Sequence, residues 1–238
     1  SFPTRRSSDL HQSKKRKIKW MIPQVKILTN PSLHYAFQPN PEPMQSTYQK
    51  LTKQEINDLP LRSYHGPIHV AASLNNANRA IDALLKENVI GFDTETRPAF
   101  RQGEAYLPSI LQLAGHDAVY IFQLNKVGLC ESILRILSNP DIIKCGVGLH
   151  RDLADLMQLS PFNPEAVIDL GTAARRADVP HHGLRGLTAL FLGFRISKQA
   201  STTNWSAKEL SIKQITYAAT DAWVGRELYF KFKDEQLL

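Results

Sequence analysis

Residues 89–96 read Val-Ile-Gly-Phe-Asp-Thr-Glu-Thr. The apolar run and the strand-favouring residues in it predict a buried β-strand over 89–93. Side chains alternate between the two faces of a strand, so Asp93 and Glu95 project from the same face. Two such carboxylates can share one divalent cation or bridge two, because Mg²⁺ and Mn²⁺ prefer oxygen ligands. A solvated strand end with two ordinary acids is the alternative that this stretch leaves open.

A third acidic residue lies in a long amphipathic stretch near the end of the chain. Between residues 210 and 232, apolar residues recur at helical spacing: Ile212, Ile215, Ala219, Ala222, Trp223 and Leu228. Ser211 is suited to cap this helix. Tyr217 and Asp221 are four residues apart, so they share one face. The carboxylate can bind a cation and the phenol can orient a water, whereas a half-buried tyrosine beside a surface aspartate is the alternative.

The middle of the chain supplies a fourth carboxylate. Residues 142–147 form a mostly apolar run that predicts another strand, and a helix is expected from about residue 150 to residue 159. Asp152 falls at the start of this helix, where the helix dipole tolerates an anion. Asp155 lies one turn further on and is the competing candidate. We favour Asp152 because it is nearer the end of the strand.

Taken together, these residues resemble the DEDDy group of 3′–5′ exonucleases, which includes ribonuclease D and the exonuclease domain of the Werner-syndrome helicase. The resemblance extends over about Gly66 to Lys233 and includes Asn204-Trp205-Ser206. It also includes Tyr-Ala-Ala-Thr-Asp-Ala at residues 217–222. The sister group carries a histidine five residues before the last aspartate, and this chain has Thr216 at that position.

The resemblance implies a fold, a reaction and a set of residues. The fold is α/β, with a ribonuclease H-like mixed sheet flanked by helices on both faces. The reaction is hydrolysis of phosphodiester bonds at the free 3′ end of DNA or RNA, releasing nucleoside 5′-monophosphates. Two divalent cations, Mg²⁺ or Mn²⁺, would be held by Asp93, Glu95, Asp152 and Asp221, with Tyr217 as the fifth catalytic residue. A non-catalytic nucleic-acid-binding module is the alternative, and the intact carboxylates argue against it.

Residues before the last helix are candidate contacts to nucleic acid. Arg185, Lys198 and Lys208 could bind phosphates. Trp205 could stack on a base, or it could pack against the last helix. Asp169 ends a short predicted strand near the expected pocket, and we favour a helix cap or a backbone ligand over a metal ligand for it.

The rest of the pattern alternates between strands and helices. Further strands are expected at 67–71, 110–114, 118–122 and 167–169, and helices at 73–87, 129–137, 172–177, 184–191 and 211–233. Interleaving of this kind is typical of an α/β sheet with helices on both faces. We expect an amino-terminal extension over residues 1–65 and the exonuclease domain over residues 66–238.

The formal charge of the chain is +7, but most of it lies at the amino terminus. Residues 1–20 hold seven basic residues and one acid, which leaves a net charge of only +1 for residues 21–238. Any phosphate-binding surface of the domain must therefore come from local clustering or bound metal.

The extension itself is expected to be disordered and in part an artefact. Residues 1–10 resemble the translation of a sequencing-adapter oligonucleotide, so Met21 or Met44 could be the true start. The basic run at residues 14–17 would otherwise indicate a nuclear signal or a nucleic-acid arm. Residues 23–43 are rich in proline and lack an apolar period.

Other features point to a cytoplasmic protein, with a nuclear location left open. The two cysteines, Cys130 and Cys145, do not suggest a disulfide framework and are expected to be reduced packing residues. No apolar run approaches the length of a membrane span. Gly146 and Gly148 hint at a dinucleotide-binding fingerprint, but the third glycine is missing, so no nucleotide cofactor is expected. The sequence leaves the oligomeric state open.

Overall fold

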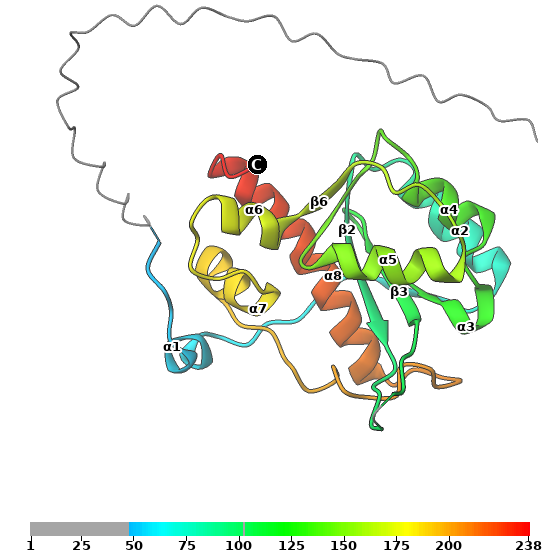
Figure 1. Cartoon of the computed structure of the whole chain (residues 1–238), viewed down its shortest axis with the longest axis horizontal. Helices are drawn as coiled ribbons and strands as arrows, with labels where there is room; N and C mark the ends of the chain where they lie inside the picture. The colour runs from blue at the N-terminus through cyan, green and yellow to red at the C-terminus, as the bar shows by residue number, and fades with distance from the viewer. Residues whose placement is uncertain (1–47, 102) are drawn as a thin grey trace, which may run out of the picture. The chain divides into compact units, whose positions relative to one another are not determined.

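The computed structural model describes residues 48–101 and 103–238 (Figure 1). The expectations about an artefactual start, a basic arm and a disordered lead-in fall on residues 1–47 and lie outside the described residues.

The centre of the described chain is a mixed six-stranded sheet, as the sequence predicts. Its strands are β1 (Ile68–Ala71), β2 (Val89–Thr96), β3 (Pro108–Ala114), β4 (Val119–Gln123), β5 (Ile143–Gly146) and β6 (Val167–Asp169). They lie in the order β1-β4-β3-β2-β5-β6. β2 pairs antiparallel with β3 and parallel with β5, so the strand that carries the first acidic residues is in the middle of the sheet.

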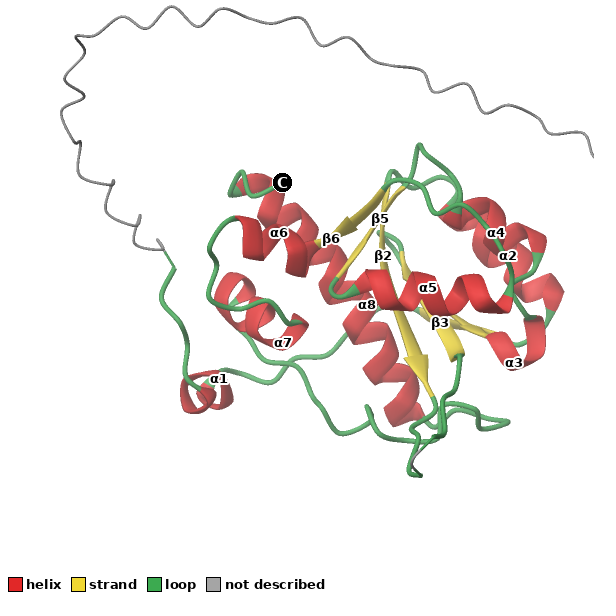
Figure 2. Ribbon diagram, viewed as in Figure 1, coloured by secondary structure: helices red, strands yellow, loops and turns green. Residues whose placement is uncertain are grey.

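Helices cover both faces of the sheet, which confirms the expected α/β architecture (Figure 2). They are α1 (Lys53–Asp58), α2 (Leu74–Leu84), α3 (Leu124–Val127), α4 (Glu131–Leu137), α5 (Leu149–Leu159), α6 (Leu170–Arg176), α7 (Leu184–Leu187) and α8 (Ile212–Asp234), with a π-helical turn, η1 (Thr188–Leu192), after α7. One core joins α2, α4 and α5 to Ile90 and Phe92. The other face packs on α8, which Ser211 caps through a capping box with Gln214. None of the helices in the described residues is long and apolar enough to cross a membrane.

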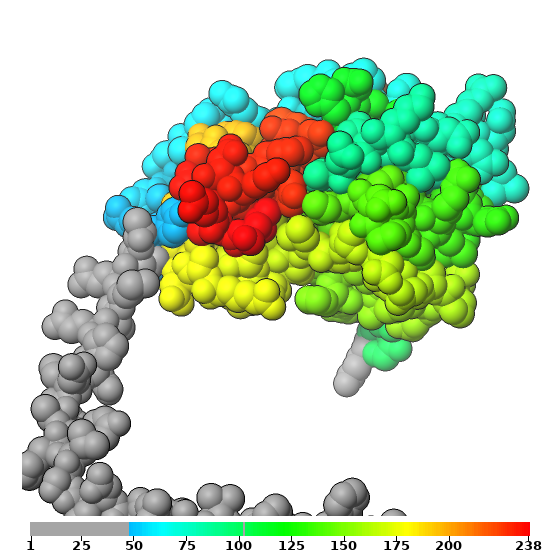
Figure 3. Space-filling model, turned by 90° about the horizontal axis from the view of Figure 1, so that it is seen from above, coloured from blue at the N-terminus to red at the C-terminus, as the bar shows by residue number. Residues whose placement is uncertain are grey.

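The segment 48–65 differs from the sequence expectation of a disordered extension. It contains α1, and it is attached to the domain by aromatic and backbone contacts. The rings of Tyr48 and Phe191 have centroids 5.2 Å apart. The Tyr64 amide donates to Thr220 Oγ1 of α8 at 3.0 Å. In the space-filling view the start of the described chain lies beside the end of α8 (Figure 3). Local pattern missed α1 because Ile56 is its one buried residue.

A close approach of α8 to β2 fixes where the helix crosses the sheet. Gly91 faces the helix, and a Cβ built on it would lie 1.9 Å from the carbonyl oxygen of Ala222. On the next strand, a Cβ on Gly146 would lie 2.3 Å from the carbonyl oxygen of Phe92. These glycines therefore permit backbone packing that no larger residue would allow, as the sequence indicated for Gly146.

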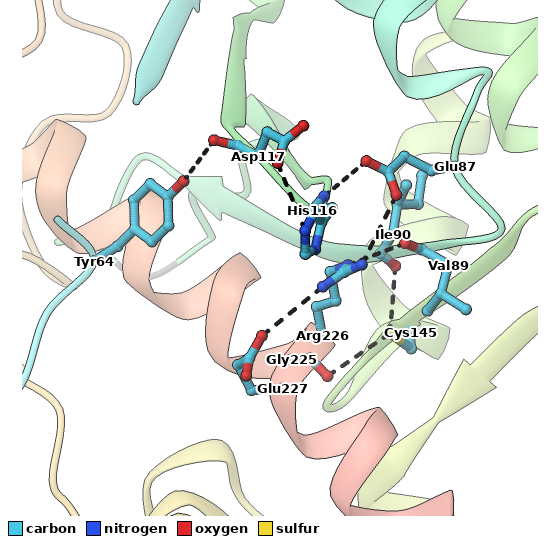
Figure 4. Close-up of polar contacts among 10 residues, drawn as sticks. All are labelled: Tyr64, Glu87, Val89, Ile90, His116, Asp117, Cys145, Gly225, Arg226 and Glu227. Carbon is cyan, nitrogen blue, oxygen red and sulfur yellow. Dashed lines mark hydrogen bonds and ion pairs between the residues drawn. The ribbon is translucent and has the colours of Figure 1, made fainter. Parts of the chain in front are cut away.

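Polar contacts fasten α8 to the start of β2 (Figure 4). Arg226 Nε donates to the carbonyl of Val89 at 3.2 Å, and its guanidinium lies 3.8 Å from Glu87. Glu87 also accepts the amide of His116 at 2.7 Å, in the turn between β3 and β4. Cys145 Sγ donates to the carbonyl of Ile90 at 3.3 Å, so this cysteine is a buried packing residue as expected. Cys130 is only partly buried.

Replacing Gly91 with alanine is expected to lower the free energy of unfolding by about 1–3 kcal/mol or more, because α8 must move away from β2 to admit the Cβ. Denaturant titration measures the change. Gly183→Ala is the control, since a Cβ at Gly183 meets nothing within 4 Å and its φ is −97°. That variant should lose less than about 1 kcal/mol. Equal losses in the two variants would contradict the close-approach argument.

Candidate active site

Three carboxylates converge where α8 crosses β2. Asp93 and Glu95 project from the same face of β2, and Asp221 faces them from α8. Each offers one oxygen, and these oxygens all lie within 4.8 Å of one another. Asp221 is only 7% exposed, and its Oδ1 has no hydrogen-bond partner. The fold thus brings together three of the four carboxylates that the sequence singled out.

The fourth carboxylate, Asp152, lies in the first turn of α5 as expected. Its Oδ1 accepts a hydrogen bond from Thr94 Oγ1, on the strand residue between Asp93 and Glu95. The charge of Asp152 contributes to raising the pKa of both Asp93 and Glu95, which places it within electrostatic reach of these two carboxylates. Asp155, the competing candidate, instead lies 3.8 Å from Arg151.

Asp169 holds the start of α5 in place. Its Oδ2 accepts the Leu149 amide at 2.7 Å, and its Oδ1 caps α6 through the Thr172 amide at 2.8 Å. Asp169 is therefore a helix cap and backbone ligand, as the sequence favoured. By fixing Leu149, it positions the helix turn that carries Asp152.

The four carboxylates resist ionisation in the metal-free protein. Burial is the largest cause, and repulsion from neighbouring carboxylates adds to it for Asp93 and Glu95. The pKa of Glu95 is raised to about 9 and that of Asp221 to about 7, and the pKa of Asp93 is well above its ordinary range. Burial also raises the pKa of Asp152, although the hydrogen bond from Thr94 opposes this. A cation placed among these groups would remove most of the repulsion.

Tyr217 lies one turn before Asp221 on the same face of α8, as the spacing predicts. Burial and then the charges of Asp221 and Glu95 raise the pKa of its phenol. The hydroxyl therefore keeps its proton at neutral pH and can donate a hydrogen bond. Tyr217 and Asp221 also line a cavity of about 370 Å³ that opens beside the carboxylates.

Gln112 is a polar residue of the site that sequence reasoning missed. It is directly opposite Asp93 in the β2–β3 register, so its side chain lies on the same face of the sheet. It is 0% exposed, and neither its Oε1 nor its Nε2 has a hydrogen-bond partner. The signal was available as one polar residue in the apolar run 110–114.

The four residues proposed to contact nucleic acid lie in three different environments: the core, an open groove and an exposed segment. Trp205 is 0% exposed, and its ring centroid is 6.0 Å from that of Tyr217. The base-stacking expectation is therefore wrong for Trp205, which packs against the last helix because its indole fills the core beside α8. Arg185 and Lys198 line an open groove near α1. Lys208 is exposed in the segment that precedes α8.

The raised pKa values predict how stability depends on pH. The ordinary values are 3.8 for Asp and 4.5 for Glu, so between these values and the raised ones the folded state holds protons that the unfolded chain releases. The stability contribution of these groups is therefore complete below the ordinary values and falls progressively as pH rises above them, until about pH 7 for Asp221 and about pH 9 for Glu95. We expect the Tm of the metal-free protein to fall from pH 5 to pH 9, and Mg²⁺ to raise it more at pH 9.

Scanning calorimetry measures Tm as a function of pH for two variants. Asp93→Asn is the test variant, and Asp155→Asn is the control. The first variant removes a charge from the cluster and should flatten the pH dependence, whereas the second should keep it. An equal effect of Mg²⁺ on Tm at both pH values would contradict the assignment of the cluster as a cation site.

Comparison with known proteins agrees with this geometry. A family model described as 3′-5′ exonuclease matches residues 68–236. The human Exonuclease mut-7 homolog is 30% identical over 216 residues, which covers 75% of this chain and 24% of that protein. Ribonuclease D of Gluconacetobacter diazotrophicus is 31% identical over 153 residues, which covers 63% of this chain and 38% of that protein. The chain thus spans less than half the length of these curated relatives.

The solved structures include the Nibbler EXO domain of Aedes aegypti. It superposes with a TM-score of 0.64 at 23% identity, covering 73% of this chain and 92% of that one. A likeness at this identity bears on the fold, and it confirms the expected ribonuclease H-like class. The family model covers most of the described residues and includes all four carboxylates and Tyr217. This chain belongs to the 3′–5′ exonuclease family.

Proposed function

We propose that this protein removes nucleotides one at a time from the 3′-hydroxyl end of a nucleic acid and releases nucleoside 5′-monophosphates. The observation that carries the proposal is the convergence of Asp93, Glu95 and Asp221, whose ligand oxygens lie within 4.8 Å of one another. Membership of the exonuclease family supplies the class of reaction.

The residues present fit divalent cations. The donors are carboxylate oxygens, which Mg²⁺ and Mn²⁺ prefer, and the described residues of the cluster include neither cysteine nor histidine. The buried Oδ1 of Asp221 has no hydrogen-bond partner and is free to bind a cation, which would offset the repulsion among the carboxylates. Two divalent cations would stabilise the attacking and the leaving oxygens of an in-line displacement.

The chain's own residues divide the work between binding and orientation. Asp93, Glu95 and Asp221 would hold the cation nearest the attacking water, and Asp93 would be shared with a second cation supported by Asp152. Thr94 holds the Asp152 carboxylate by its hydrogen bond, so the strand that presents two ligands also orients the fourth. Gln112 lies on the same face as Asp93 without a partner of its own.

Tyr217 would orient the attacking water. Its phenol keeps its proton because burial and then the surrounding carboxylates raise its pKa, so it would act as a hydrogen-bond donor or acceptor and not as a charged base. This role requires the hydroxyl to be held beside Asp221, and the shared face of α8 provides that placement.

Asp152→Asn should lower mononucleotide release by at least about 10²-fold, because it removes one of the carboxylates that would hold the cations that stabilise the negative transition state. The amide oxygen of asparagine can still accept from Thr94, so the fold should be kept. Asp155→Asn is the matched control, since Asp155 lies one turn further along α5 and pairs with Arg151. It should stay within a few-fold of the parent.

The measurement is chromatography of products from matched single-stranded and duplex DNA and RNA, in Mg²⁺ and in Mn²⁺. A 3′-phosphorylated strand should resist degradation. If Asp152→Asn keeps the parent rate, the assignment of the fourth carboxylate fails. If the parent binds nucleic acid without metal and releases no mononucleotide from any substrate, the chain is a binding module and not a nuclease.

Tyr217→Phe should lower the turnover number by about 10²–10⁴-fold while Tm changes little, because only the hydroxyl is removed. Tyr229→Phe is the matched control, since Tyr229 is buried on the same helix, three turns further on. A large fall in Tm for Tyr217→Phe with unchanged activity per folded molecule would assign the tyrosine to packing.

A further inference from the structure

An open groove of about 630 Å³ lies between residues 50–56 and the segment 181–186. We call it the basic groove, because it is lined by three lysines and one arginine, the groove cations: Lys50, Lys53, Arg185 and Lys198. They come from three separate stretches of the chain. Among the described residues, those that line the groove include no aspartate or glutamate. The fold therefore gathers positive charge here that the nearly neutral domain does not show as a whole.

The charge of the groove cations is not neutralised by carboxylates of the described chain. No ion pair within residues 48–101 and 103–238 involves any of the four. The acids of α1 have other partners: Glu55 accepts the Thr52 amide at 2.7 Å, and Asp58 accepts from Gln54 at 2.8 Å. Arg185 donates to Asn57 Oδ1 through Nη2, but its Nε is buried without a partner.

His181 joins the two walls of the groove. Its Nε2 accepts the Leu51 amide at 3.0 Å, which ties the segment before α1 to the loop before α7. Burial lowers the pKa of His181, and the charges of Lys50 and His182 lower it further. Lys50 is therefore within electrostatic reach of His181, and a bound anion would stabilise the positive charge that lines the groove.

The groove is continuous in sequence with the candidate active site. Lys198 lies between Ser197 and Gln199, which line the 370 Å³ cavity together with Tyr217 and Asp221. The chain that leaves α1 contributes Arg62 to the same cavity. Figure 1 shows α1 next to α7, and the segment after α7 leading to the start of α8. A long anion in the groove could therefore reach the carboxylate cluster along one side of the domain.

We propose that the basic groove binds the phosphodiester backbone of the nucleic-acid substrate, upstream of the 3′ end that the carboxylate cluster receives. This inference rests on the proposed function, since continuity with a nuclease site is what favours a nucleic acid over another polyanion. Contacts of this kind are made to phosphates and carry no sequence information, so they serve DNA and RNA alike. The groove sets affinity for long strands, and the chemistry stays with the carboxylates.

The test uses Lys50→Gln/Lys53→Gln, a double variant of two exposed groove cations that lie outside the active-site cavity. Anisotropy of a labelled long single strand, in EDTA so that nothing is hydrolysed, gives Kd as a function of salt. Loss of two phosphate contacts should weaken binding by about tenfold at low salt and reduce the salt slope by about 1.5. The turnover number on a trinucleotide in Mg²⁺, which is too short to fill both sites, should stay within a few-fold of the parent.

The matched control is Arg79→Gln/Lys86→Gln, which removes two exposed charges on and just after α2, on the other face of the sheet. This variant should keep the parent affinity and salt slope. Equal weakening in both double variants would assign the effect to overall charge and overturn the groove. Unchanged affinity in the groove variant would also overturn it, as would binding to anionic lipid vesicles in place of the oligonucleotide. Specific weakening in a parent that releases no mononucleotide would leave the groove standing and remove the proposed function.

Discussion

The approach of α8 to β2 is the constraint on which the site depends. Where the helix crosses the strand, one carboxylate oxygen of Asp221 lies within 4.8 Å of one oxygen each of Asp93 and Glu95. Gly91 removes the side chain that would stand between Ala222 and the strand, and Arg226 ties the next turn of the helix to Val89. The position of one glycine thus sets the spacing of three carboxylates.

The packing around this contact opposes the electrostatics of the site. Burying carboxylates together raises their pKa values and destabilises the ionised folded state. The apolar faces of α8 and of α2, α4 and α5 hold the sheet from both sides and offset this cost. Because Thr94 and Asp169 hold Asp152 and its helix by hydrogen bonds, the fourth carboxylate is also kept in place without a cation.

The periodicity of apolar residues and the spacing of the acidic residues predicted much of the fold and of the carboxylate cluster from sequence. Alternation along a strand placed Asp93 and Glu95 on one face, and a four-residue interval placed Tyr217 beside Asp221. Local patterns could not identify what only tertiary structure creates. Gln112 looks like a defect in an apolar strand until the register sets it opposite Asp93. The sequence around Trp205 is compatible with base stacking, but in the folded chain the core buries its ring. Helix α1 is stabilised by its capping box and by contacts with residues distant in sequence, which a local pattern does not contain.

The distribution of charge connects the candidate site to its proposed substrate. An acidic cluster repels a polyanion, so affinity for nucleic acid must come from bound cations or from positive charge elsewhere. Residues 21–238 carry a net charge of only +1, which is too little for a general attraction. The groove cations would supply a local attraction for a polyanion. They are displaced from the carboxylates and lie on the same side of the sheet as α8. Under the proposed function, such a separation would let a strand be held at one place and cut at another, so that the carboxylate cluster keeps the negative charge that cation binding requires.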